Sequence, residues 1–524
     1  MEVFPRVARA YTLIRTPYSL NNAMKQLLLS LAAFALLFSA AFAQTDPAAE
    51  PDPSVMSDAY YQIWNDDVQK AIDERIEKYR KADATVELTD VKTGSEIKVE
   101  QISHEFIFGA HIFNFNQLGT TQRNEKYKAL YGTLFNSATI AFYWKTFEME
   151  PGKPRFKTEQ RDTEEFWNNV QDPKSQPHWR RPASDEVVEF CKSKGIRLHG
   201  HTIIWGNQKW QRPTWLWDYV SKQFPEEREI LFKTAEARKK MTPAEIYKLA
   251  PNYFDAMNEL YWNRIRMLGE HYKGTLDSWD VVNESATDYH GQAVTGDKVT
   301  KSKYGHVMPG DYTYNSFKIA QEVFPDSVKL NINDYANNQN YADQVNDLVA
   351  HGAKIDIVGS QMHLFRPQQT LDIAAGAEIQ TPEKVLNTMK ILATTGRPIH
   401  LSEITITAPN DDANGRAIQA IVARNLYRLW FSVPEMMGIT WWNVVDDCGA
   451  PGEPTTSGLF TRNMEPKPSY FALNKLINEE WKTNFVQKAD AETVTLQFRG
   501  FKGKYRATWT DKNGKTQSKE FTVK

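Results

Sequence analysis

Two glutamates stand at the ends of short apolar segments, where a carboxyl group can act on a bound substrate. Glu284 ends the segment 278–284 (SWDVVNE), and Glu403 ends the segment 397–403 (RPIHLSE). A pair of carboxyl groups can cleave a glycosidic bond, because one donates a proton to the leaving oxygen while the other attacks the anomeric carbon or activates water. Taken alone, either glutamate is also compatible with an ordinary loop carboxylate, a residue type that is mostly exposed.

The elements that must position these glutamates alternate between short apolar strands and longer helical stretches. Eight strands are predicted near 106–112, 135–142, 196–203, 277–283, 328–333, 355–361, 398–403 and 438–443. Eight strand–helix units predict an α/β fold with a parallel sheet closed into a (β/α)8 TIM barrel. An open doubly wound sheet is the alternative, but it usually has a glycine-rich phosphate-binding turn after its first strand, and none is visible. Barrel enzymes hold catalytic groups at the carboxyl ends of the strands, where both glutamates are expected.

Small β-rich appendages are predicted on both sides of the barrel, which is assigned to residues 105–482. Residues 58–104 begin with a helix over 58–81 and continue as a β-hairpin over 84–101. Residues 483–524 alternate again and predict a small C-terminal β-module, which could join the hairpin in one unit. A charged stretch over 218–255 is expected to form a helical excursion after the third strand, with its charges on a solvated face.

The N-terminus has the features of a secretory signal, assigned to residues 1–43. A basic residue precedes an apolar run, and Ala41-Phe42-Ala43 is a small-x-small cleavage site; Met24 is an alternative start. A transmembrane anchor is the less favoured alternative, because the run is short and no basic stop-transfer cluster follows. We therefore expect a secreted protein (periplasmic, at the cell surface or extracellular) with no membrane span in the mature chain. Residues 44–57 predict a disordered linker.

Composition argues against several other classes of function. The 524 residues carry a formal net charge of −2, so no basic field attracts nucleic acid. Cys191 and Cys448 are the two cysteines, too few for a disulfide framework or a four-cysteine zinc site, and no metal or cofactor is expected. The 15 Trp and 22 Tyr hint at stacking on sugars, although most such residues belong to protein cores. The oligomeric state is not predicted.

An ordered series of motifs resembles glycoside hydrolase family 10, the retaining endo-β-1,4-xylanases, over about 106–475. The segment 279–284 (WDVVNE) is identical to the acid/base motif of that family, and 401–403 (LSE) is similar to its nucleophile motif Ile-Thr-Glu. The series also includes 200–205 (GHTIIW), 330–335 (LNINDY), 359–364 (GSQMHL), 438–442 (GITWW) and 466–470 (PKPSY). The resemblance implies a retaining β-glycosidase that acts by double displacement, with a xylan-type polysaccharide or oligosaccharide as its substrate.

The resemblance further implies roles for nine residues. Glu284 would be the general acid and then the general base, and Glu403 the nucleophile, whose negative charge would raise the pKa of Glu284. Asn283 would bind the 2-hydroxyl of the sugar beside the scissile bond, and Lys145 and His201 would hold hydroxyls of the same region. Gln361 and His363 would brace the nucleophile. Trp442 would stack under the sugar ring, and Trp205 is the ninth predicted site residue. His363 and Trp205 are also compatible with purely structural roles.

Departures from the family pattern cluster at the predicted substrate contacts. After the second strand the family has Glu and Asn, where this chain has Ala141 and Phe142, and after Trp205 it has His, where this chain has Gly206. Two residues past the nucleophile the family has Asp, and this chain has Thr405. The family's Trp lid after the last strand is replaced by Ala450, which is followed by the loop 451–454 (PGEP). Because the catalytic pair is intact, the open alternatives are a decorated xylan or another β-linked glycan or glycoside. A non-catalytic carbohydrate-binding protein is less favoured, and polysaccharide binding by the β-rich ends is a further hypothesis.

Overall fold

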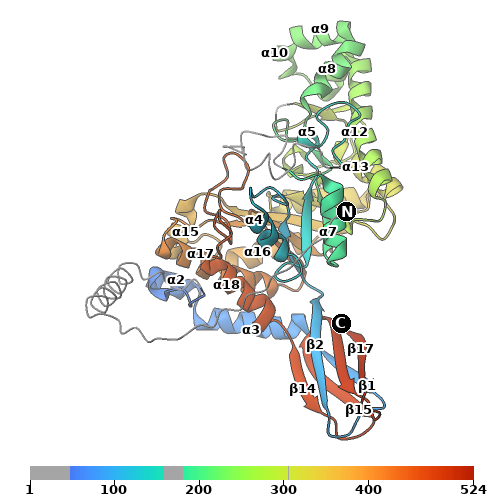
Figure 1. The fold of residues 1–524 in the computed structure, drawn as a ribbon. Coiled ribbons are helices and arrows are strands. Elements are labelled where there is room, and N and C mark those ends of the chain that lie inside the picture. The colour runs from blue at the N-terminus through green and yellow to red at the C-terminus, as the bar shows by residue number, and fades with distance from the viewer. Residues whose placement is uncertain (1–47, 158–180, 305) are drawn as a thin grey trace, which may run out of the picture. The chain divides into compact units, whose positions relative to one another are not determined.

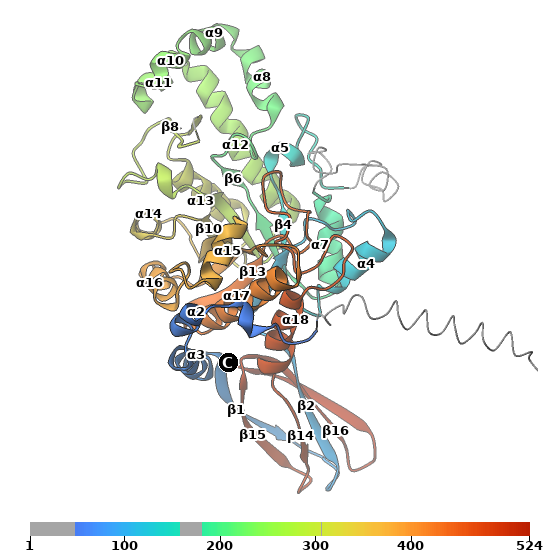
Figure 2. The same cartoon turned by 90° about the vertical axis from the view of Figure 1, so that its left-hand side faces the viewer.

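A closed parallel sheet forms the centre of the fold. The structure is a computed structural model that describes residues 48–157, 181–304 and 306–524, so the predicted signal segment 1–43 lies outside the described residues. The barrel strands are β3 (Ile107–His111), β4 (Ser137–Ala141), β5 (Arg197–His201), β7 (Ser278–Asn283), β10 (Lys329–Asp334), β11 (Ile357–Leu364), β12 (Ile399–Ile406) and β13 (Met436–Trp441). They pair in parallel in this order, and the pairing of β13 with β3 closes the ring. Figures 1 and 2 show the barrel and the helices around it. The predicted (β/α)8 barrel is confirmed.

Helices follow the strands and surround the barrel. They include α4 (Thr121–Ala129), α7 (Ser184–Ser193), α12 (Pro251–Tyr272), α13 (Tyr312–Val323), α14 (Gln339–Ala350), α15 (Pro367–Ala374), α16 (Pro382–Ala393), α17 (Ala413–Phe431) and α18 (Pro468–Lys475). Several begin at a capping side chain: Asn338 caps α14 and Asp412 caps α17 by accepting a hydrogen bond from a first-turn N–H. The predicted excursion over 218–255 is confirmed as helical, and it consists of α8 (Thr214–Gln223), α9 (Pro225–Lys233), α10 (Ala235–Arg238) and α11 (Pro243–Leu249).

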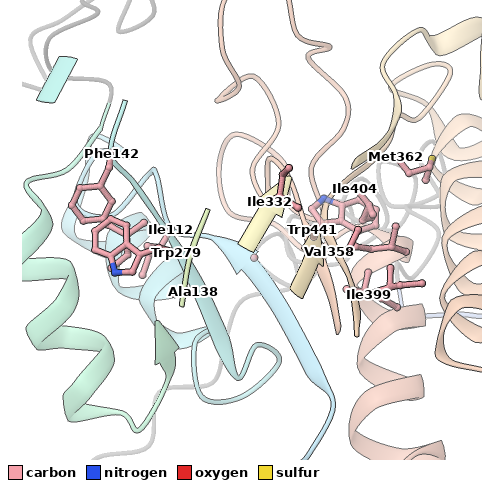
Figure 3. Close-up of a cluster of buried hydrophobic side chains, with 14 of the residues drawn as sticks. Ile112, Ala138, Phe142, Trp279, Ile332, Val358, Met362, Ile399, Ile404 and Trp441 are labelled. Carbon is pink, nitrogen blue, oxygen red and sulfur yellow. The ribbon is translucent and has the colours of Figure 1, made fainter. Parts of the chain in front are cut away.

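The strands that carry the two glutamates are buried along their whole length, as both faces of a barrel strand are covered. Trp279 on β7 packs against Phe142, with ring centroids 4.6 Å apart (Figure 3). The same indole lies over Gly200 on β5, where an added Cβ would be 2.2 Å from a ring carbon. A glycine at position 200 is therefore required for β7 to pack beside β5.

Strands from both ends of the described chain form one β-module. Strand β1 (Lys81–Leu88) pairs with β15 (Val494–Phe501), while β2 (Glu96–His104) lies between β14 (Asn484–Lys488) and β16 (Gly503–Thr510), which pairs with β17 (Thr516–Val523). The predicted hairpin over 84–101 is therefore wrong, because β1 and β2 form but belong to different sheets (Figure 2). Alternating residues such as Val86 and Val99 do face one apolar cluster, which is completed by C-terminal residues such as Leu496.

The N-terminal helical region also differs from the prediction. Residues 58–81 form two helices, α2 (Asp58–Ile63) and α3 (Asp66–Arg80), because the Asn65 side chain caps a second start. The predicted disordered linker 44–57 is wrong for its last residues, since Pro53–Val55 form a 3-10 turn, Met56 is buried, and the Ser57 N–H donates to Ala374. In the described parts of the chain, no helix combines the length and the apolar surface needed to span a bilayer.

A buried ion pair fixes the segment after β13. Lys467 Nζ lies 3.1 Å from each carboxylate oxygen of Asp446 and also donates to the Thr456 carbonyl, while the Gly458 N–H donates to Asp446. Burial raises the pKa of Asp446 and lowers that of Lys467, so each charge depends on the other.

Replacing Lys467 with Met is expected to lower the free energy of unfolding by about 3–5 kcal/mol, because Asp446 would remain buried without its counter-charge. The measurement is denaturant unfolding at pH 7. Lys390→Met, at an exposed position on α16, is the control. Equal midpoints for the two variants would contradict the assigned role of the pair.

Candidate active site

Glu284 and Glu403 lie in one pocket at the carboxyl end of the barrel. Glu284 directly follows β7, and Glu403 lies within β12. The pocket has a volume of about 560 Å³. Of the nine predicted site residues, those that line it are His201, Trp205, Asn283, Glu284, Gln361, His363, Glu403 and Trp442.

The backbone turns sharply at Glu284. Its φ is +53°, in the left-handed region that non-glycine residues rarely adopt, and its N–H donates to the Asn333 carbonyl at 2.7 Å. Outliers of this kind occur at functional sites, where the surrounding structure holds the residue in place. The turn ends β7 and brings the carboxyl group to the pocket.

Three donors reach the Glu284 carboxyl group. Trp205 Nε1 and the Tyr304 hydroxyl donate to Oε2 at 3.1 and 2.5 Å, and Gln361 Nε2 donates to Oε1 at 3.3 Å. Burial raises the pKa of Glu284 to about 7, and the negative charge of Glu403 adds to the rise, while the bond from Tyr304 opposes it. A carboxyl group with this pKa can both donate and accept a proton near neutral pH.

Glu403 is held by a polar network from neighbouring strands. Asn333 Nδ2 on β10 donates to Glu403 Oε1 at 2.8 Å and to Asn283 Oδ1 at 2.9 Å, and the Ser402 hydroxyl donates to Asn333 Oδ1. Gln361 Nε2 also reaches Asn283 Oδ1, at 3.3 Å. The network links the strand ends of both glutamates, so Asn333 orients Asn283 and Glu403 together.

Two histidines also lie close to the Glu403 carboxylate. His363 Nε2 lies 3.3 Å from Oε2, and His201 Nε2 lies 3.7 Å from Oε1. Burial alone would lower the pKa of His201, but the negative charges of Glu403 and Asp280 outweigh it and raise that pKa. His201 Nδ1 is 2.8 Å from Asp280, whose buried carboxylate it shares with His199. These positions support the predicted bracing of Glu403 by His363, whereas Gln361, predicted for the same role, donates to Glu284 and Asn283 instead.

Thr405 keeps the contact that the family gives to Asp. Its hydroxyl lies 2.9 Å from His363 Nδ1, so the imidazole is oriented by a neutral group in place of a charged one. The presence of glycine at position 206 also has a structural explanation, because a Cβ there would lie 2.8 Å from the Ser302 hydroxyl. The segment that carries Ser302 therefore packs where a larger side chain at position 206 would stand.

Apolar side chains fill the positions of the missing Glu and Asn. Ala141 packs with Phe113 and Trp442, and Phe142 is fully buried. Tyr143 follows them and lines the pocket, with its ring centroid 5.5 Å from that of His201. The wall of the pocket next to Trp442 is therefore aromatic.

Lys145 does not join the predicted group. It lies on the short helix α5 (Trp144–Phe147), and its Nζ donates to the Lys209 carbonyl at 3.0 Å. It lines a neighbouring pocket, whereas the pocket of the glutamates is lined by Tyr143. The prediction that Lys145 and His201 hold the same sugar is therefore not supported by the geometry, because α5 begins between Tyr143 and Lys145 and redirects the chain.

Sequence reasoning missed several polar groups of the site, among them Tyr304, Asn333 and Glu453. Tyr304 and Asn333 bond to the glutamates, and Glu453 lines the pocket while it accepts hydrogen bonds from Asn443 and Ala450. Asn333 lies inside the motif 330–335, so its position at a strand end was a usable signal. Tyr304 and Glu453 lie in loops, where the sequence pattern carries no such signal.

Replacing Tyr304 with Phe is expected to raise the pKa of Glu284, because the hydroxyl donates to the carboxylate form and stabilises it. The alkaline limb of the kcat/KM profile should then move up by about one pH unit. The measurement is the pH dependence of hydrolysis of an aryl β-glycoside. Tyr314→Phe, on α13, is the matched control, and an unmoved limb in Tyr304→Phe would refute the assignment.

The described residues contain no group of three or more His, Cys, Asp or Glu side chains placed to hold a metal ion.

Comparisons with known proteins agree with the motif series. The profile of glycosyl hydrolase family 10 matches residues 100–476. Endo-1,4-beta-xylanase A of Caldicellulosiruptor sp. (strain Rt8B.4) is 26% identical over 277 residues, which cover 50% of this chain and 35% of that protein. Endo-1,4-beta-xylanase B of Thermotoga neapolitana is 24% identical over 346 residues, covering 64% of this chain and 84% of that protein.

One solved structure similar to this chain is xylanase 10B from Thermotoga petrophila RKU-1 in complex with xylobiose. The two share 19% identity with a TM-score of 0.48, over 72% of this chain and 95% of that one. The first curated relatives are longer proteins, and the match spans only 22–35% of the length of three of them. The family profile covers well over half of the chain, and the chain therefore belongs to glycosyl hydrolase family 10.

Proposed function

We propose that this chain is a secreted retaining β-glycoside hydrolase, an endo-β-1,4-xylanase that cleaves xylan-type polysaccharide by double displacement. One observation carries the proposal: Glu284, whose pKa burial raises to about 7, shares a pocket with Glu403. The names of family relatives, most of them endo-1,4-beta-xylanases, support the choice of substrate. The apolar run 27–42 and the site at 41–43 support secretion.

In the first step the Glu403 carboxylate attacks the anomeric carbon while Glu284 gives its proton to the leaving oxygen. The glycosidic bond breaks and a covalent glycosyl-enzyme forms. Glu403 then carries no charge, so the pKa of Glu284 falls and its carboxylate takes a proton from water. That water attacks the anomeric carbon, frees Glu403, and leaves the product with its original β configuration.

The residues around the pocket that differ from the family pattern affect which sugar is bound rather than which reaction is catalysed. Ala141 and Phe142 offer no hydrogen bonds where relatives have Glu and Asn, so sugars beyond the cleaved unit are held differently. The second candidate is therefore a retaining hydrolase of a decorated xylan or of another β-linked glycan. The aromatic wall of Tyr143 and Trp442 is the observation that favours it.

Product analysis on xylans, glucans and arabinogalactans tests the proposal. We expect new reducing ends and internal cleavage on xylan, and NMR of the early products should give the β anomer. Early products of the α anomer would contradict the retaining course. Binding to a glycan with no reducing-end release from any polymer would instead support a non-catalytic binding protein.

A further inference from the structure

A second pocket lies beside Glu284 and takes no part in the mechanism above. Its volume is about 580 Å³, and its lining residues are Lys145, Asn207, Gln208, Lys209, Arg212, Pro213, Thr214 and Tyr304. Asn207 lines both pockets, and the Tyr304 hydroxyl donates to Glu284 Oε2. The second pocket, which we call the basic pocket, therefore adjoins the group that protonates the leaving oxygen.

The charge of the basic pocket is one-sided. Lys145, Lys209 and Arg212 contribute three cations, and no Asp or Glu is among the described residues that line it. Lys145 Nζ donates to a backbone carbonyl, while Lys209 Nζ lies 4.4 Å from the centre of the Trp210 ring. The Arg212 guanidinium lies 5.5 Å from the centre of the Trp217 ring. These contacts position the cations and leave their charge available to an anion.

The remaining lining groups suit a sugar that carries the anion. Asn207 and Gln208 offer amide donors, and Thr214 and Tyr304 offer hydroxyls. A guanidinium matches the two oxygens of a carboxylate, and the lysines add point charges. A neutral xylan chain carries no negative charge to match these three cations.

We propose that the basic pocket binds the carboxylate of a uronic acid carried by the polysaccharide substrate. The inference rests on the proposed function and narrows it, because it selects a carboxylated β-linked polymer as the preferred substrate. The adjacency of Tyr304 and Glu284 sets the uronic acid close to the cleaved bond.

The test compares glucuronoxylan with the same polymer after its carboxyl groups have been reduced to primary alcohols. The two polymers differ only at this group, which is a carboxylate in one and a primary alcohol in the other, so the ratio of their kcat/KM values reports on the carboxylate. We expect wild type to favour the carboxylated polymer by about tenfold, since a charge-assisted hydrogen bond contributes at least that factor. The preference should shrink as NaCl rises to about 0.5 M, because the charges are partly exposed.

Variants of the lining residues test whether the preference for the carboxylated polymer arises in the basic pocket. Arg212→Gln and Lys209→Gln should each move the ratio of the two kcat/KM values towards one, while Lys222→Gln, an exposed lysine outside the pocket, should keep the wild-type ratio. A wild-type ratio of one overturns the inference, and so does a ratio that Arg212→Gln and Lys209→Gln leave unchanged.

A binding experiment separates this inference from the proposed function. The full chain carrying Glu403→Gln is run through affinity gels that contain either polymer or polygalacturonate. Stronger retardation by glucuronoxylan than by its reduced form supports the inference even if no hydrolysis is found. Equal retardation by the two forms, or none, overturns it, and so does retardation by polygalacturonate alone, because an acidic backbone would then be the ligand.

Discussion

Glu403→Ala is expected to lower kcat/KM for an aryl β-glycoside by a factor on the order of 10⁵, because it removes the nucleophile of the first step. Asn333, His363 and His201 all direct polar atoms at the Glu403 carboxylate, so the variant leaves their contacts unused as well. The fold should persist, since no charge is left buried without a partner. Activity is measured by release of the phenol, and far-ultraviolet circular dichroism confirms folding.

Azide makes the same variant diagnostic. A small anion can enter the space that the carboxylate leaves and attack the anomeric carbon from the same side, releasing the phenol and forming an α-glycosyl azide. Recovery of activity with that product identifies Glu403 as the nucleophile. Glu383→Ala, at an exposed position on α16, is the control and should keep full activity. Wild-type activity of Glu403→Ala without azide would refute the assignment.

Glu284→Ala is expected to slow hydrolysis of xylan by about 10²- to 10⁴-fold, the usual contribution of a general acid. The first step should be much less affected with a 2,4-dinitrophenyl glycoside, because that leaving group needs no proton. Hydrolysis of the intermediate also loses its general base, so a burst of phenol should precede a slow steady state. Stopped-flow absorbance records both phases.

The pH profile provides the second readout for Glu284. Wild type needs the protonated form, whose pKa is about 7, so its kcat/KM should fall as the pH rises through that value. Glu284→Ala has no such group, and the alkaline limb should vanish. A limb that stays at the same pH in the variant would assign the titration to another residue.

The strand ends could be predicted because their chemistry is local. An apolar run that ends in a carboxylate predicts both the strand and the residue at its carboxyl end. Strand β7 confirms this for Glu284, whereas β12 forms as predicted but continues past Glu403 to Ile406. Contacts made by loops could not be predicted, since Tyr304 reaches Glu284 from a loop with no regular sequence pattern. Lys145 shows a different limit, because counting along the sequence does not reveal that α5 redirects the chain.

The β-module shows why the pairing of strands is harder to predict from the sequence than their position. Alternation of Val86 and Leu88 marks the buried face of β1, but every strand with the same period offers an equally good apolar partner. A short connection favours the hairpin in a sequence argument. The C-terminal strands are the actual partners of β1 and β2. The local sequence pattern does not indicate which strands far along the chain will pair.

The shared β-module also imposes an order on biosynthesis. Strands β1 and β2 leave the ribosome before the barrel, yet their hydrogen-bonding partners are made only after it. Contacts between strands so far apart in the sequence form late. The barrel must therefore bring β1 and β2 close to the C-terminal strands before the module can close. Until then the open edges of β1 and β2 can pair with other chains. A nascent or truncated polypeptide that lacks the C-terminal strands of the module is thus the form most exposed to aggregation and proteolysis.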